Sequence, residues 1–158
     1  MKLLIFLAVL IVTAFNTVQA QDSATNKRLN ESLQSYYSIK DALVAGNSKA
    51  ASNAATSFIK SLNGISYKVI SEGNVNTLLT DAGIIADARS IDKQRAAFSN
   101  FSTNMAEVVK ALKFASSPVY IQYCPMKKAS WLSNEKAIKN PYYGSSMLTC
   151  GKVTETIQ

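Results

Sequence analysis

The chain has 158 residues, a net charge of +7, two cysteines and no histidine. The lack of histidine excludes Ser-His-Asp and Cys-His catalysis in their usual forms and the common zinc sites, so we expect a protein that is not an enzyme. The lysines are scattered, with Lys127-Lys128 as the only adjacent pair, which predicts a basic solvated surface and no nucleic-acid partner.

The first twenty residues predict a signal peptide. A short positive start precedes the apolar run Leu3–Phe15, and Val18-Gln19-Ala20 has the small-x-small form of a cleavage site. The run is shorter than the roughly 20 residues that a membrane span needs. We expect cleavage after Ala20, a periplasmic or secreted protein with no stable membrane anchor, and a single domain over residues 21–158. The alternative is an uncleaved N-terminal anchor.

Three-and-four spacing of apolar residues predicts four helices. We expect the first over Asn26–Leu43, the second over Ser48–Leu62, the third over Val75–Ala88 and the fourth from Ser90 or Asp92 to Leu112. Whether the third and fourth form one bent helix stays open. Short connections between amphipathic helices are typical of an up-down four-helix bundle, so the predicted class is mainly α.

The character of the sequence changes in the tail, residues 118–158. The β-branched and aromatic run Val119–Tyr123 favours one short extended segment. The rest is mostly turn chemistry around Asn140-Pro141 and Tyr143-Gly144, with room for one short helix around Asn134–Ile138. The tail has too few apolar residues to fold alone, so we expect it to be irregular and to pack on the bundle.

Four sulfur atoms come from two pieces of this tail. They belong to Cys124, Met126, Met147 and Cys150. Thiolates and thioethers are soft donors, and among biological metals they select Cu(I). The alternative is a disulfide between the two cysteines, which is the commoner fate of a cysteine pair in an exported protein, with both methionines as core fillers. Both interpretations place the cysteines near one another.

Arg95 lies on the apolar side of the fourth predicted helix, next to Phe98. A buried arginine needs partners for its guanidinium group. We expect it to form a structural salt bridge with Asp41 or Asp92, or to reach a carbonyl oxygen of the tail.

Three stretches in order resemble a known family: YYSIKDALVAGNSKAASNAATSF, DARSIDKQRAAFSNFSTNM and VYIQYCPMKKASWLSNEKAIKNPYYGSSMLTCGKVTETI. From about Leu29 to Ile157 the chain resembles the domain of unknown function 3347 family. The tail signature is specific and the helical part much less so. Members of this family occur alone behind a signal peptide, and also fused to the C-terminal end of periplasmic adaptor subunits of heavy-metal efflux pumps.

The resemblance implies a metal-delivery module. Carried over to this chain, the implied ligands are Cys124, Met126, Met147 and Cys150, with Trp131 and the turn 140–144 shaping the site. The opening Y-C-P-M is also similar to the Y-x-C-P-M of short heavy-metal-binding domains attached to copper transporters. Here the histidine that usually follows C-P-M is Lys127, and one cysteine replaces a C-x-x-C pair. This departure argues against a zinc-like tetrahedral site and leaves a sulfur-only Cu(I) site.

We therefore expect an exported module that holds or transfers a soft metal ion, Cu(I) first, in metal efflux or homeostasis. Its expected partners are the metal ion and a heavy-metal efflux adaptor or another periplasmic protein. The alternative is a disulfide-stapled protein–protein interaction module that binds no metal.

Overall fold

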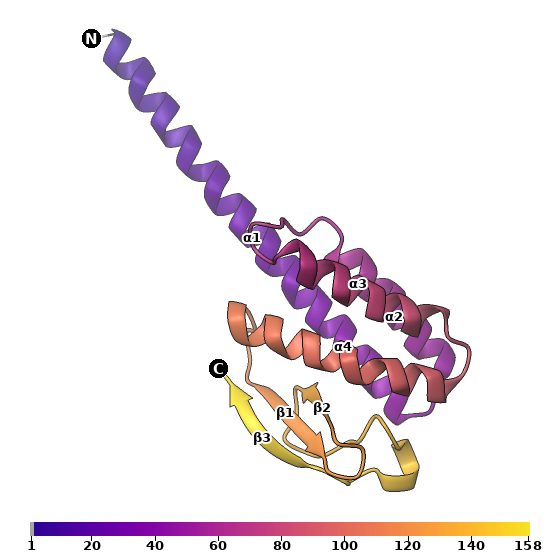
Figure 1. The fold of residues 1–158 in the computed structure, drawn as a ribbon. Coiled ribbons are helices and arrows are strands. Elements are labelled where there is room, and N and C mark those ends of the chain that lie inside the picture. The colour runs from indigo at the N-terminus through magenta and orange to yellow at the C-terminus, as the bar shows by residue number, and fades with distance from the viewer. Residues whose placement is uncertain (1) are drawn as a thin grey trace.

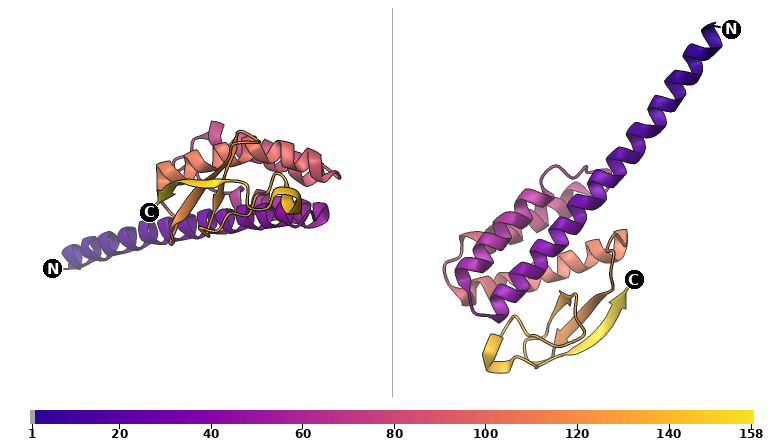
Figure 2. Two further views of the ribbon diagram at one scale, coloured as in Figure 1. Left: turned by 90° about the horizontal axis from the view of Figure 1, so that it is seen from below. Right: turned by 180° about the vertical axis from the view of Figure 1, so that it is seen from behind.

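Four helices followed by a small sheet make up the computed structural model shown in Figure 1. It describes the backbone from Lys2 to Gln158 and the side chains of residues 23–158. The helices are α1 (Lys2–Val44), α2 (Ser48–Leu62), α3 (Glu72–Asp87) and α4 (Ile91–Leu112). Consecutive helices pack on one another, and the sheet lies against α4 (Figures 1 and 2). The prediction of a mainly α protein is confirmed.

The helix boundaries follow from capping side chains. Asn47 caps α2 by accepting a hydrogen bond of 3.0 Å from the amide of Ala50. Ser71 caps α3 in the same way, and α3 therefore begins three residues before the predicted start at Val75. The third and fourth helices are separate, because the chain becomes extended at Ala88 before α4 begins.

Aromatic rings from three helices form the centre of the helical core. Tyr36 of α1 stacks on Phe98 of α4 with 5.3 Å between ring centroids, and Phe58 of α2 meets Phe101 edge-on at 4.7 Å. All four side chains are fully buried. Apolar side chains at helical spacing surround them on α1, α2, α3 and α4: Leu29, Leu33, Ile39, Leu43, Ala51, Ala55, Leu62, Val75, Leu78, Ala82, Ile85, Met105, Val108 and Val109. The predicted helical faces are therefore the core.

The tail forms an antiparallel sheet, so the prediction of an irregular tail with one extended segment was wrong. Its strands are β1 (Val119–Cys124), β2 (Ala129–Ser133) and β3 (Lys152–Ile157), in the order β2-β1-β3. Only β1 was predicted. Every side chain of β3 except the last is exposed, so β3 lacks the alternation that marks a strand in a sequence. Pairing with β1 keeps it extended.

The short helix expected around Asn134–Ile138 is also absent. Residues 134–137 form bends, and a 3₁₀ helix, η1 (Gly144–Met147), lies further along the tail. The amide of Gln122 on β1 explains the bends, because its Nε2 donates to the carbonyl oxygens of Glu135, Lys136 and Ala137 at 2.8–3.2 Å. Those carbonyls are therefore satisfied by a side chain and not by helical bonds.

Two polar side chains attach the tail to the helices. The backbone amide of Leu132 donates to the hydroxyl of Tyr36 at 3.0 Å, and that hydroxyl also pairs with Ser102 at 2.7 Å. Arg95 donates to the carbonyl oxygens of Pro141 at 3.0 Å and Leu43 at 2.9 Å. Of the two expectations for Arg95, the tail carbonyl is thus confirmed, and the salt bridge was wrong.

The predicted signal peptide falls on residues 1–20, whose side chains lie outside the described part of the chain. It therefore stays a prediction, as does a domain boundary after residue 20. Within the part that the structure describes, we find no helix with the length and apolar character of a membrane span.

Candidate metal centre

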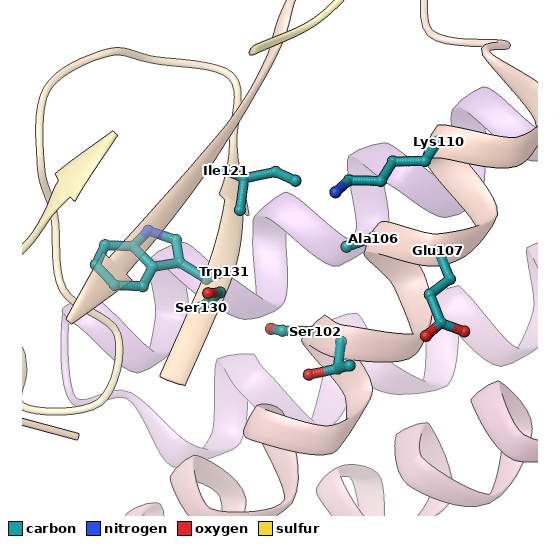
Figure 3. Close-up of a pocket in the computed structure, with 8 residues that line it drawn as sticks. Ser102, Ala106, Glu107, Lys110, Ile121, Ser130 and Trp131 are labelled. Atoms are coloured by element: carbon teal, nitrogen blue, oxygen red, sulfur yellow. The ribbon is translucent and has the colours of Figure 1, made fainter. Parts of the chain in front are cut away.

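The two cysteines meet at the end of β1. Their sulfur atoms are 3.4 Å apart, and neither is in a disulfide. Side chains alternate along β1 where it pairs with β2, so Cys124 lies on the opposite face from Ile121, which points toward α4 in Figure 3. The cysteine pair therefore lies on the sheet face that is turned away from α4, beneath the segment that joins β2 to β3.

Gly151 allows the chain to bring Cys150 beside Cys124. Its φ of +154° lies in the region that favours glycine, and a Cβ there would stand 2.9 Å from Cη2 of Trp131 and 3.1 Å from the carbonyl oxygen of Tyr123. Both contacts are closer than real Cβ atoms tolerate without displacing their neighbours. The close passage of the chain over Trp131 thus requires glycine.

Hydrogen bonds fix the backbone of Cys150 on both sides. Its amide donates to the carbonyl oxygen of Met147 at 3.1 Å, and its carbonyl oxygen accepts from Nδ2 of Asn140 at 2.8 Å. Oδ1 of Asn140 accepts in turn from the amide of Tyr142 at 2.9 Å. Asn140 is fully buried, so this one side chain determines where the second cysteine stands.

The two thiols differ in their electrostatic surroundings. Burial by itself would raise the pKa of Cys124, but hydrogen bonds to its sulfur from the backbone of Lys127, the thiol of Cys150, the amide of Asn140 and the backbone of Met126 outweigh it and lower the pKa. The hydrogen bond to Cys124, followed by burial, raises the pKa of Cys150. The first proton is therefore lost from Cys124, and Cys150 donates its remaining proton to that thiolate.

The two methionines flank this pair at the surface. Met126 is 65% exposed and Met147 is 41% exposed. Met126 lies two residues after Cys124 in the turn that follows β1, and the carbonyl oxygen of Met147 accepts from the amide of Cys150. Of the four predicted ligands, the structure brings the two cysteines into contact and exposes the two methionine side chains to solvent.

The donor set around the pair is limited to sulfur. Over residues 23–158 the structure contains no group of three or more histidine, cysteine, aspartate or glutamate side chains that could hold an ion. Zinc in structural sites requires four such ligands.

Sequence reasoning missed the groups that orient the ligands. Against the effect of burial, the backbone of Lys127, the side chain of Asn140 and the backbone of Met126 all lower the pKa of Cys124. The family resemblance implied that the turn 140–144 shapes the site, but it did not indicate that the side chain of Asn140 bonds the backbone of Cys150. The only sequence signal for Asn140 was its place just before Pro141 in that turn.

A family model described as "Protein of unknown function (DUF3347)" matches residues 32–117, which is more than half of the chain. The chain belongs to this family. The matched segment runs from α1 to the end of the helical part and stops just before β1. The cysteine tail thus lies outside the part that defines DUF3347 here, and its metal-ligand role stays a prediction. No curated protein and no solved structure matches the chain at a significant level.

A cavity of about 250 Å³ lies between the DUF3347 helices and the sheet (Figure 3). Several of its polar groups already bond within the protein: Ser102 pairs with Tyr36, Thr103 donates to Ser99, and Lys110 pairs with Glu155. The volume is below the roughly 300–1,000 Å³ of typical small-molecule sites. The cysteine pair is consequently the stronger candidate for a functional site.

Proposed function

We propose that this protein is an exported module that holds or transfers a soft metal ion, with Cu(I) as the first choice. The observation that carries the proposal is the 3.4 Å separation of the Cys124 and Cys150 sulfurs. Two thiols at this distance, with two thioethers beside them, form a donor set of the kind that selects Cu(I) over harder ions.

The spacing of the sulfurs suits a shared ion. With metal–sulfur bonds of about 2.3 Å and the 120° angle of a three-donor site, two thiolates on one ion stand about 4.0 Å apart. The pair at 3.4 Å needs only a small opening to reach that geometry. Rotation of the partly exposed Cys150 side chain supplies it, while β1 pairing holds Cys124 in place.

The hydrogen bonds around Cys124 support binding as a thiolate. Against the effect of burial, the backbone of Lys127 and Met126 lowers the pKa of Cys124, and groups that stabilise the thiolate also favour its bond to a metal ion. Binding an ion between the sulfurs displaces the proton that they share. Affinity should consequently rise with pH until both thiols are ionised.

The surroundings of the site favour transfer over permanent storage. Met126 and Met147 stand at the surface beside the pair, where weak thioether contacts allow an ion to enter and leave by stepwise exchange. As part of the same proposal, the protein acts outside the cytoplasm after cleavage behind Ala20 and exchanges its ion with a heavy-metal efflux adaptor or another periplasmic protein. The up-down order of its four helices also belongs to the proposal, supported by the packing of consecutive helices.

A competition titration tests the metal site. The reduced protein is titrated with Cu(I) without oxygen, against a chromophoric Cu(I) chelator. We expect one ion per chain, with binding abolished in both Cys124→Ser and Cys150→Ser. Met126→Leu combined with Met147→Leu should weaken it about tenfold, as for other supporting ligands. Met105→Leu, which changes a methionine buried in α4, is the matched control and should bind as wild type does.

Two results would contradict the proposal. Reduced protein that fails to compete for Cu(I) at micromolar concentration would leave the disulfide-stapled interaction module as the better function. Cysteine variants that bind as tightly as wild type would move the site elsewhere. Far-UV circular dichroism of every variant establishes that the helices are intact.

A further inference from the structure

The two sulfurs of the pair differ in their access to solvent. Cys124 has no exposed surface, because β1 and the segment over it enclose the side chain, whereas Cys150 is partly exposed. A reagent in solution can therefore reach Cys150 and cannot reach Cys124. Access of this kind selects which sulfur takes part in exchange reactions.

We propose that the pair performs reversible thiol–disulfide exchange with small anionic disulfides, entering at Cys150 and resolved by Cys124. In the first step Cys150 passes its proton to the Cys124 thiolate across the 3.4 Å gap, and its sulfur attacks one sulfur of the external disulfide. A mixed disulfide forms, the external S–S bond breaks, and the first small thiol leaves as a thiolate that takes a proton from water.

In the second step the sulfur of Cys124 attacks Sγ of Cys150 across the 3.4 Å gap. The internal S–S bond forms, the mixed disulfide breaks, and the second small thiol leaves with the proton of Cys124. Two electrons have moved from the protein dithiol to the external disulfide, which is now two thiols. An excess of small thiol reverses both steps through attack on the exposed sulfur of Cys150.

The backbone is already arranged for the closing step. Cys150 is held on its amide side by Met147 and on its carbonyl side by Asn140, and Cys124 is held by pairing with Ala129. A disulfide requires about 2.05 Å between sulfurs, so closure shortens the 3.4 Å gap by about 1.4 Å. Preorganisation of this kind favours closure over capture of a second external thiol.

Positive charge around the pair defines the class of disulfide. The segments 124–128 and 147–152, which carry the two cysteines, contain three lysines and no acidic residue. Lys127, Lys128 and Lys152 are all exposed. They attract an anionic disulfide and repel a cationic one, and this preference should weaken as salt screens it.

Exchange also regulates the metal site, and this part of the inference rests on the proposed function. Closing the bridge removes both thiolates from the donor set, so an oxidised chain cannot hold Cu(I). Conversely, a bound ion occupies the sulfur of Cys150 and should slow its attack on a disulfide. The module would then carry its ion only while the small-thiol pool keeps the pair reduced.

The test is to mix the reduced full-length protein with glutathione disulfide, quench with acid and identify the products by mass spectrometry. In wild type we expect both free thiols to disappear, with a transient adduct of one glutathione on Cys150. Cys124→Ser should accumulate that adduct, because it lacks the resolving sulfur. Cys150→Ser should stay unmodified while folded, because its remaining thiol is buried.

The charge preference is tested with wild type alone. Glutathione disulfide, which is anionic, should react at least several times faster than cystamine, which is cationic, and 1 M salt should bring the two rates together. Site mapping of the transient adduct also uses wild type only, so the test survives a variant that fails to fold. An adduct on Cys124, or a dithiol that stays unreacted, would overturn the inference, and equal rates for the two reagents would overturn its anionic substrate class.

The failures of the two proposals are distinguishable. Suppose that the pair exchanges with disulfides as described but the reduced protein binds no Cu(I). The proposed metal-binding function then fails, and the thiol–disulfide exchange stands without any control of Cu(I) binding. If Cu(I) binds and no exchange occurs, only the exchange inference is lost.

Discussion

The helical part of this protein and its tail are ordered by different means. In the helices, burial is apolar and repeats at helical spacing, as in the ring cluster of Tyr36, Phe58 and Phe101. In the tail, single buried amides hold stretches of chain that have no regular bonds of their own: Gln122 satisfies three carbonyls, and Asn140 fixes both Tyr142 and Cys150. The comparison teaches that the helices depend on apolar contacts spread over a large core and the tail on a few specific hydrogen bonds.

The largest effect is expected from the helical core. Phe101→Ala removes a fully buried ring that lies 4.7 Å from Phe58 and 5.4 Å from Tyr36, and such truncations cost about 3–5 kcal/mol. Because the sheet packs on α4, helix and tail should unfold together. Urea unfolding should show one lowered midpoint for both far-UV circular dichroism and thiol reactivity.

The matched control for that change is Phe114→Ala, which truncates a partly buried phenylalanine just after α4. Phe114→Ala should lower the urea-unfolding midpoint much less than Phe101→Ala does. A Phe101→Ala protein whose thiols stay protected beyond the helical transition would break the comparison, since the tail would then be stable without the helices.

A smaller and more local effect is expected from Asn140→Ala. The change leaves the amide of Tyr142 and the carbonyl of Cys150 without their partner, at a cost of about 1–3 kcal/mol for each group that stays buried. The tail should loosen while the helices persist. Thiol-reagent kinetics should show faster reaction of Cys150, with an unchanged helical signal.

Asn100→Ala changes an exposed position of α4 and is the matched control for Asn140→Ala. It should change neither the reaction rate of Cys150 nor the helical circular dichroism signal. Loss of helical signal in Asn140→Ala, in step with thiol exposure, would contradict the division between the two regions. It would mean that the helices also depend on the order of the tail.

This division explains what the sequence could predict. The four helices were predictable because Leu33, Phe58 and Leu78, like their neighbours, recur at the spacing of one helical face. β3 was missed because every side chain except that of Ile157 is exposed, which removes the alternation that marks a half-buried strand. The role of Arg95 was left open because its acceptors, Leu43 and Pro141, are backbone carbonyls that no residue type marks.

The sequence predicted which residues make up the candidate site, but it predicted only part of how they are arranged in space. The nearness of Cys124 and Cys150 was expected from both interpretations of the pair, and the structure has them in contact. The hydrogen bonds to the sulfur of Cys124 depend on how residues 125–128 turn. That turn is set by the register of β1 with β2, which is a tertiary feature and leaves no pattern in the sequence.

The smallest effect is expected from the ion pair that links the two regions across the surface. Lys110 of α4 bonds Glu155 of β3 at 2.6 Å, but both side chains are nearly half exposed, so their coupling should be less than about 1 kcal/mol. A double-mutant cycle with Lys110→Ala and Glu155→Ala measures it from urea midpoints. The coupling should decrease further in 1 M salt, where the Debye length is about 3 Å.

The pair Lys139–Glu135 provides the matched control, since its N–O distance is 2.7 Å and its exposure is the same, but both partners belong to the tail. The two cycles should give couplings of similar size, because exposure and not location limits a surface ion pair. A coupling for Lys110 and Glu155 well above that of the control, and insensitive to salt, would contradict this. Surface charge would then join sheet to helices, and the buried bonds of Tyr36 and Arg95 would no longer be sufficient to explain how the tail is held.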